Sequence, residues 1–204
     1  MNTIHLHRDD LPAGLSLGPM VAVDTETMGL DPRRDRLCLV QLSAGDGTAH
    51  LVQIRKPIAE CPNLKALLAD PATTKLFHFA RFDVAMLANA LGIEVAPVIC
   101  TKIASKFVRT YTDRHGLRDL CRDLLGVDIS KQQQSSDWGA DELTAEQRAY
   151  AASDVLHLHA IWAKLEALLV REGRLDLARA CYAFLPARGR LDLLGYVDPD
   201  IFAH

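Results

Sequence analysis

The stretch MVAVDTETMGL, residues 20–30, carries the most information about the fold of this 204-residue chain. It begins with a short apolar run rich in valine and continues through Thr-Glu-Thr to Gly29. This pattern predicts a buried β-strand that stops at a turn. Because side chains alternate between the two faces of a strand, Asp24 and Glu26 are expected to point the same way at its carboxyl end.

Acidic residues also interrupt two later apolar stretches. Asp83 lies in FHFARFDVAML, residues 77–87, and Asp154 follows Tyr150 in YAASDVLHL, residues 150–158. Burying an unpaired carboxylate costs several kcal/mol, so acids in core-forming segments usually have a cation as partner. Hard divalent ions are bound by oxygen ligands, and the three stretches together therefore predict a site for metal-assisted phosphoryl chemistry.

Each acid has a simpler explanation when it is taken alone. Asp24 and Glu26 fit a solvated strand end. Asp83 lies in the first turn of an expected helix, where a negative charge contributes about 0.3–1 kcal/mol of stability. Tyr150 lies one helical turn before Asp154, so its hydroxyl either orients a water molecule or only bonds to Asp154 while the ring packs.

The remaining sequence predicts an α/β domain. Residues 37–43 and 48–53 are expected to form two strands joined by a glycine-rich turn, with further strands at 75–79 and near 98–100. Thr144 and Gln147 fit a capping box that opens one long helix ending at about Val170. Other helices are expected at 62–69, 80–91, 101–108 and 117–125, and the apolar spacing of residues 175–194 predicts a helix broken at Pro186.

Composition favours a single enzyme domain outside the membrane. With 49% hydrophobic residues the chain can bury a full core, and its length fits one domain. It has no uninterrupted apolar run of about 18 residues, and its N-terminus lacks a long apolar stretch, so no membrane span or secretory signal is expected. The five cysteines show no zinc spacing and predict reduced, packed residues of a cytoplasmic protein.

The formal net charge of −3 differs from the basic balance of proteins that grip long nucleic acids. Residues 102–131 are locally basic, which suits a small substrate with few phosphates. Within that stretch, Arg118 and Arg122 are expected to pair with Asp119 and Asp123 on a solvated helix face.

The order of these motifs resembles the DEDD superfamily of 3′→5′ exonucleases, with an early Asp-x-Glu, a central Asp in a short helix and a late Tyr-x-x-x-Asp. Tyr150 occupies the position that defines the tyrosine subclass. Further likeness to the ribonuclease D branch comes from Arg118-Asp-Leu, Leu124-Leu-Gly-Val-Asp, Ser136-Asp-Trp and the YAASDVLHL helix. The resemblance implies a ribonuclease H-like fold with a mixed β-sheet flanked by helices.

Thr101-Lys-Ile-Ala-Ser and Lys131-Gln-Gln-Gln-Ser-Ser-Asp-Trp look most like the compact nanoRNase C type. Ribonuclease D carries additional C-terminal helical domains that help to hold RNA. They are not expected here, because the sequence stops at His204. We therefore expect one exonuclease domain over residues 1–204, with the motifs in residues 20–170 and a helical segment in residues 171–204.

The resemblance implies a metal-dependent 3′→5′ exoribonuclease that releases 5′-mononucleotides from short RNA, with a preference for dinucleotides, and that assembles as a homo-oligomer, a ring-shaped octamer. Asp24, Glu26, Asp83 and Asp154 would hold two Mg²⁺ or Mn²⁺ ions. These ions would activate the attacking water and stabilise the leaving 3′ oxygen. Tyr150, whose ordinary pKa is near 10, is expected to orient the water.

Substrate-binding residues are expected in two regions. Thr25, Met28, Gly29 and Leu30 follow the first acids, with Leu30 as a wedge between the bases. His78 and Phe79 would supply a hydrogen bond and a stacking face. A cap on the 5′-phosphate is expected from polar residues of the basic stretch, namely Arg109, Tyr111, Arg114, His115 and Gln133.

Two alternatives to this function remain. A general 3′→5′ exonuclease would act on longer RNA or on DNA through an open groove. A catalytically silent nucleic-acid-binding ring protein would assemble without turnover.

Overall fold

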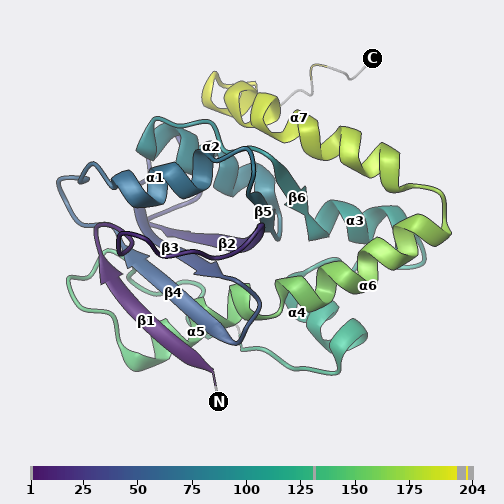
Figure 1. The fold of residues 1–204 in the computed structure, drawn as a ribbon, viewed down its shortest axis with the longest axis horizontal. Helices are drawn as coiled ribbons and strands as arrows, with labels where there is room; N and C mark the ends of the chain where they lie inside the picture. The colour runs from purple at the N-terminus through teal and green to yellow at the C-terminus, as the bar shows by residue number, and fades with distance from the viewer. Residues whose placement is uncertain (1, 131, 197–200, 202–204) are drawn as a thin grey trace.

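Six strands form one mixed β-sheet in the computed structural model, which describes residues 2–130, 132–196 and 201 (Figure 1). The sheet order is β1-β4-β3-β2-β5-β6. The antiparallel pairs are β2 with β3 and β3 with β4, and the parallel pairs are β1 with β4, β2 with β5 and β5 with β6. The strand bounds are Thr3–Arg8 (β1), Met20–Thr27 (β2), Leu37–Ser43 (β3), Thr48–Gln53 (β4), Thr74–Phe77 (β5) and Val98–Cys100 (β6).

Helices cover both faces of the sheet. In Figure 1, α1 (Pro62–Ala69) and α2 (Ala80–Leu91) lie on one side and α5 (Ala145–Leu156) on the other. The central strand β3 is buried along its whole length because both of its faces are covered. The remaining helical segments are α3 (Thr101–Val108), α4 (Leu117–Leu120) with the π-helical turn η1 (Cys121–Leu125), α6 (Leu158–Arg171) and α7 (Leu175–Leu193).

The hairpin expected at residues 37–53 is confirmed, with the predicted strand bounds. Gly45 and Gly47 adopt φ values of 81° and 86°, which glycine reaches without strain. The Ser43 hydroxyl accepts from the Gly45 N–H at 3.2 Å and donates to the Thr48 carbonyl at 2.7 Å. The turn therefore satisfies its own polar groups.

The prediction of one helix from Thr144 to Val170 is wrong. The capping box of Thr144 and Gln147 is present, but α5 ends at Leu156, and α6 starts at Leu158 after the junction residue His157. Helix α5 packs on β2, β3 and β4, whereas α6 packs on α3 and η1. The chain has to change direction between these two surfaces. Residues 156–158, Leu-His-Leu, contain no Gly or Pro that would have predicted this change from the sequence.

The break predicted at Pro186 is also wrong. Helix α7 runs through it from Leu175 to Leu193. Packing against α2 and β6 holds the helix across the missing N–H, and Arg81 of α2 pairs with Asp192 at 2.6 Å. Tertiary contacts therefore override the local cost of proline.

Some features lay outside the sequence prediction. Strand β1 was not expected, although Ile4 and Leu6 alternate with polar residues along it. The helix expected at residues 117–125 divides into α4 and η1. Lys131, part of the expected basic stretch, lies outside the described residues. Among the helices of the described chain, none combines the length and hydrophobicity that a membrane span requires.

Candidate active site

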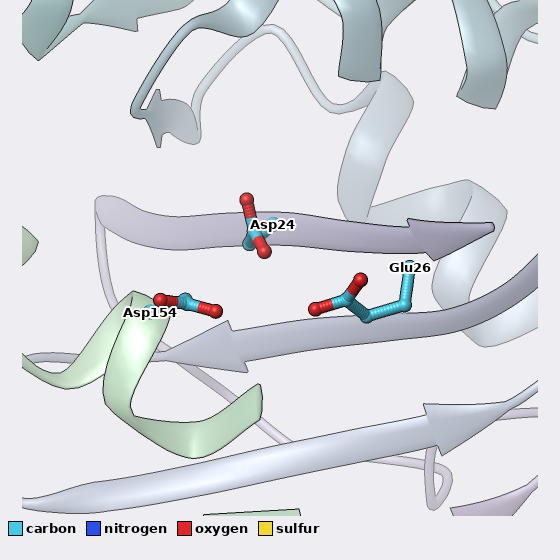
Figure 2. A group of neighbouring side chains, drawn as sticks. All are labelled: Asp24, Glu26 and Asp154. Atoms are coloured by element: carbon cyan, nitrogen blue, oxygen red, sulfur yellow. The ribbon is translucent and has the colours of Figure 1, made fainter. Parts of the chain in front are cut away.

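Three of the predicted acids meet beneath β2. Asp24 and Glu26 project from β2, and Asp154 projects from α5 toward them (Figure 2). One carboxylate oxygen from each of the three residues lies within 4.8 Å of the others. Glu26 stands opposite Leu39 of β3, which packs with Ala151 of α5, so the contact of α5 with the sheet brings Asp154 to the strand.

Asp83 reaches the same cleft from α2. It is buried, and the Thr25 hydroxyl donates to its Oδ1 atom at 2.6 Å. Thr25 lies between Asp24 and Glu26 on β2 and points away from their face. Its hydrogen bond fixes Asp83 beside them, and the Asp83 charge acts on both acids. Thr25, predicted to bind substrate, thus positions a carboxylate.

Burial is the largest cause of the raised pKa values of all four acids. The pKa of Asp24 is raised well above its ordinary value, with further repulsion from Asp83, Asp154 and Glu26. The pKa of Glu26 rises to about 9, and those of Asp83 and Asp154 rise to about 7. Hydrogen bonds from Thr25 to Asp83 and from Tyr150 to Asp154 oppose the last two shifts.

The cluster has no cationic side chain as a partner. None of the ion pairs formed by the described residues includes one of these four carboxylates. A set of close, buried oxygen ligands without a counter-charge fits hard divalent cations such as Mg²⁺ and Mn²⁺. The donor set therefore suits the metal that the sequence predicts.

Tyr150 remains protonated in this environment. Burial first, and then the charges of Asp154, Glu26 and Asp24, raise the pKa of its hydroxyl. The hydroxyl donates to Asp154, and the ring lies 5.9 Å from that of Trp138 at a tilt of 37°. Because the hydroxyl keeps its proton near neutral pH, Tyr150 can donate a hydrogen bond at the site. It does not form the phenolate that would be needed to act as a general base.

The four acids and Tyr150 line a cleft of about 800 Å³. Met28, Gly29 and Leu30 form one side, and Leu30 is 87% exposed. A Cβ atom at Gly29 would lie 2.2 Å from Asp35 Oδ2. A larger residue at position 29 would therefore have to displace the Asp35 carboxylate, which caps the Asp31 N–H in the same loop.

His78 and Phe79 also line the cleft. Burial, followed by Lys102 and His115, lowers the pKa of His78 to about 3, so its ring is neutral. The Thr101 hydroxyl donates to the Phe77 carbonyl at 3.2 Å and therefore accepts from His78 Nδ1 at 2.9 Å. This tautomer leaves Nε2 as a hydrogen-bond acceptor.

Phe79 is the N-cap residue of α2 and has a φ angle of 67°, a backbone conformation that is uncommon for a residue other than glycine. Its ring is half exposed in the cleft, with the Lys102 ammonium 3.7 Å from the ring centroid. Sequence reasoning placed Lys102 only in a basic stretch. Lys102 lies in the first turn of α3, which follows β6 directly. Because β5 and β6 are parallel, the residues that follow them lie at the same edge of the sheet, and this placement could have assigned Lys102 to the cleft.

The predicted phosphate cap needs correction. Arg109 is buried, and its guanidinium pairs with Asp123 at 2.5 Å and donates to the Arg114 carbonyl at 2.8 Å. Its guanidinium is therefore engaged by protein groups, and Arg109 is not among the residues that line the cleft. Four further residues were predicted for the cap, and none of them lines the cleft within the described chain. They are Tyr111, Arg114, His115 and Gln133.

The ion pairing expected on the solvated helix face is confirmed for Arg122, whereas Arg118 pairs with Asp128 instead of Asp119 or Asp123. Arg122 contacts Asp119 at 2.8 Å and Asp123 at 3.0 Å. Arg118 pairs with Asp128 at 2.9 Å and also lines the cleft. Within the described part of the basic stretch, Arg109, Arg118 and Arg122 are thus paired with its own acids.

Sequence comparison places these residues within a known family. A 3′-5′ exonuclease family matches residues 9–170. Ribonuclease D of Acidiphilium cryptum is 38% identical over 162 residues, which cover 79% of this chain and 41% of that protein. Ribonuclease D of Escherichia coli is 33% identical over 147 residues, which cover 72% of this chain and 38% of that protein. The chain spans about two fifths of the length of these curated relatives.

Solved structures agree with the sequence comparison. Brucella melitensis NrnC bound to pGG is 56% identical with a TM-score of 0.96, and the match covers 100% of both chains. The same protein with bound Mg²⁺ matches with a TM-score of 0.95, 56% identity and 99% coverage of both chains. Escherichia coli RNase D matches with a TM-score of 0.75 and 31% identity, covering 84% of this chain and 45% of that one.

The mixed sheet is thus the ribonuclease H-like exonuclease fold that the sequence predicts. The chain belongs to the 3′-5′ exonuclease family, in its ribonuclease D-like branch.

Proposed function

We propose that the protein is a divalent-metal-dependent 3′→5′ exoribonuclease that releases 5′-mononucleotides from short RNA, with a preference for dinucleotides. The observation that carries this proposal is the meeting of four carboxylates without a cationic partner and one protonated tyrosine in a single cleft, with Asp83 and Asp154 buried and Asp24 and Glu26 half-buried. Membership of the 3′-5′ exonuclease family supports the direction of cleavage.

Asp24, Glu26, Asp83 and Asp154 are the residues that would hold two Mg²⁺ or Mn²⁺ ions. When bound, such ions supply an activated water molecule and neutralise charge on the scissile phosphate and the leaving oxygen. The similar NrnC structure with bound Mg²⁺ supports this assignment.

The chain's own residues would orient the reaction. The Tyr150 hydroxyl is a donor held at Asp154 and would position the attacking water through its hydrogen bond. The water oxygen bonds to phosphorus while the bond from phosphorus to the 3′ oxygen breaks. The terminal nucleotide leaves with its 5′-phosphate, and the remaining chain keeps a 3′-hydroxyl.

Apolar side chains would hold the bases. Leu30 and Phe79 both line the cleft, where Leu30 is exposed and the Phe79 ring is half exposed. A base stacked on an aromatic ring gains about 1–3 kcal/mol. Leu30 would act as the wedge between two bases, while the free Nε2 acceptor of His78 would receive a sugar hydroxyl or a base amino group.

The 5′-phosphate would be held near Lys102. Among the described Lys and Arg residues that line the cleft, Lys102 forms no ion pair with a carboxylate, whereas Arg118 pairs with Asp128. An ammonium group forms charge-assisted hydrogen bonds to phosphate. Tyr111, Arg114, His115 and Gln133 could add to the cap only from a neighbouring subunit.

Comparing four substrates tests the length preference. We expect a 5′-phosphorylated RNA dinucleotide to be cut with a higher kcat/KM than its unphosphorylated form, a seven-nucleotide RNA or the matching DNA. The binding of pGG by NrnC supports this expectation. Equal kcat/KM for the heptamer and the phosphorylated dimer would favour the general exonuclease.

The same assay locates the phosphate. Lys102→Gln is expected to raise KM for the phosphorylated dinucleotide by on the order of tenfold, with little change for the unphosphorylated one. Lys106→Gln, which removes an exposed ammonium one turn further along α3, is the matched control.

A homo-oligomer, in the form of a ring-shaped octamer, remains part of the proposal. Support comes from apolar side chains exposed at α7 and just after it, where Leu177 is 59%, Leu194 75% and Tyr196 52% exposed. A hollow of about 850 Å³ with a largely apolar lining adjoins α7 and β6. The free state of all five cysteines supports the proposed cytoplasmic location.

A further inference from the structure

Three histidines gather at the edge of the sheet that carries the N-terminus. His5 and His7 lie two residues apart on β1, and His50 of β4 stands opposite His5 in the parallel pairing. The ring centroid of His50 lies 5.1 Å from that of His5 and 5.3 Å from that of His7. The His7 Nε2 and His50 Nδ1 atoms are 3.0 Å apart.

This cluster is separate from the carboxylate site. His50 stands opposite Leu42 of β3, and Leu42 stands opposite Val23 of β2. Val23 precedes Asp24, and neighbouring residues of a strand face opposite ways. The histidines therefore lie on the other face of the sheet, with His50 two strands and His5 and His7 three strands away from β2.

We propose that His5, His7 and His50 form a second metal site, for a borderline transition-metal ion of the Zn²⁺ class. Imidazole nitrogen suits Zn²⁺, Cu²⁺ and Ni²⁺, whereas Mg²⁺ prefers oxygen. The nature of the donors thus separates the histidine cluster from the carboxylate cluster.

The spacing of two nitrogen atoms fits a shared ion. With Zn–N bonds of about 2.0–2.1 Å and tetrahedral angles, two nitrogens on one zinc lie about 3.3 Å apart. His7 Nε2 and His50 Nδ1 are already within a few tenths of an ångström of that separation. His5 is exposed and stacked on His50, so its ring would have to turn from that position to supply a third nitrogen.

The protonation state also favours metal binding. Burial, followed by repulsion from neighbouring histidines, lowers the pKa of both His7 and His50, and Asp46 opposes the shift at His50. Neutral imidazole is the form that binds metal. Only one proton can lie between the two facing nitrogens, and the ion would replace it.

Such an ion would hold the edge strand in place. Within the sheet β1 pairs only with β4. A metal bound by His7 and His50 would link these two strands through side chains as well as through the backbone. The simpler alternative is that the three rings only stack and share a hydrogen bond.

Calorimetric titration with Zn²⁺ separates these alternatives. The protein should carry no histidine tag, should be treated with a chelator, and should be held in excess Mg²⁺. We expect one Zn²⁺ per chain, with affinity lowered on the order of tenfold or more by His7→Gln or by His50→Gln. His115→Gln, whose partner is the Ser105 hydroxyl, should bind as wild type does.

Two further measurements keep the proposal testable if a variant folds poorly. Asp24→Asn should retain the Zn²⁺ site, because it alters only the carboxylate cluster. In the wild-type protein, Zn²⁺ should shift or broaden the NMR signals of the His5, His7 and His50 rings. The proposal fails if wild type binds no Zn²⁺ below about 100 μM, or if both histidine variants bind it unchanged.

Discussion

Asp24→Asn is expected to lower kcat by on the order of 10²–10⁴, because it removes a charged ligand from the centre of the carboxylate cluster. Asparagine preserves the volume of the side chain, so the sheet around it should stay intact. The measurement is mononucleotide release from a 5′-phosphorylated RNA dinucleotide at saturating Mg²⁺. Asp113→Asn, which neutralises an exposed acid, is the control and should retain wild-type turnover.

The same variant should gain stability when no metal is bound. An acid whose pKa is raised on folding destabilises the native state above its unfolded pKa of about 4, and Asp24 is such an acid. In a chelator at pH 8, Asp24→Asn should therefore melt at a higher temperature than wild type. A lower melting temperature together with lost turnover would instead indicate a structural role for Asp24.

Tyr150→Phe is expected to lower kcat by on the order of 10²–10³ with little change in KM. The ring still packs near Trp138, and only the hydroxyl that donates to Asp154 is lost. If Tyr150 serves packing alone, the phenylalanine variant should keep full activity. Equal kcat in the two proteins would remove Tyr150 from the reaction.

The pairwise spacing of the acids could be predicted from the sequence. Glu26 follows Asp24 by two positions on a strand, and Asp154 follows Tyr150 by four positions on a helix, so each pair shares a face. The position of Asp83 beside them depends on the Thr25 hydrogen bond and on the α2 packing, and neither follows from local pattern. The unpaired acids of the three stretches indicated a metal site, but the resemblance to a family was needed to assign all four acids and Tyr150 to one reaction.

The phosphate cap shows where local composition fails. A basic stretch reveals how much positive charge is present but not which way each side chain turns. Arg109 turns inward to Asp123, whereas Lys102 turns to the cleft beside Phe79. The junction at His157 and the unbroken helix through Pro186 were missed for a similar reason, since packing partners distant in sequence decide both.

The central claim is that the four carboxylates act by holding divalent ions. The most direct test is turnover of a 5′-phosphorylated RNA dinucleotide by chelator-treated protein, before and after Mg²⁺ is added. The structure predicts no mononucleotide without metal and full release once Mg²⁺ or Mn²⁺ is restored. Turnover that persists in the chelator, or that no divalent ion restores, would contradict the claim.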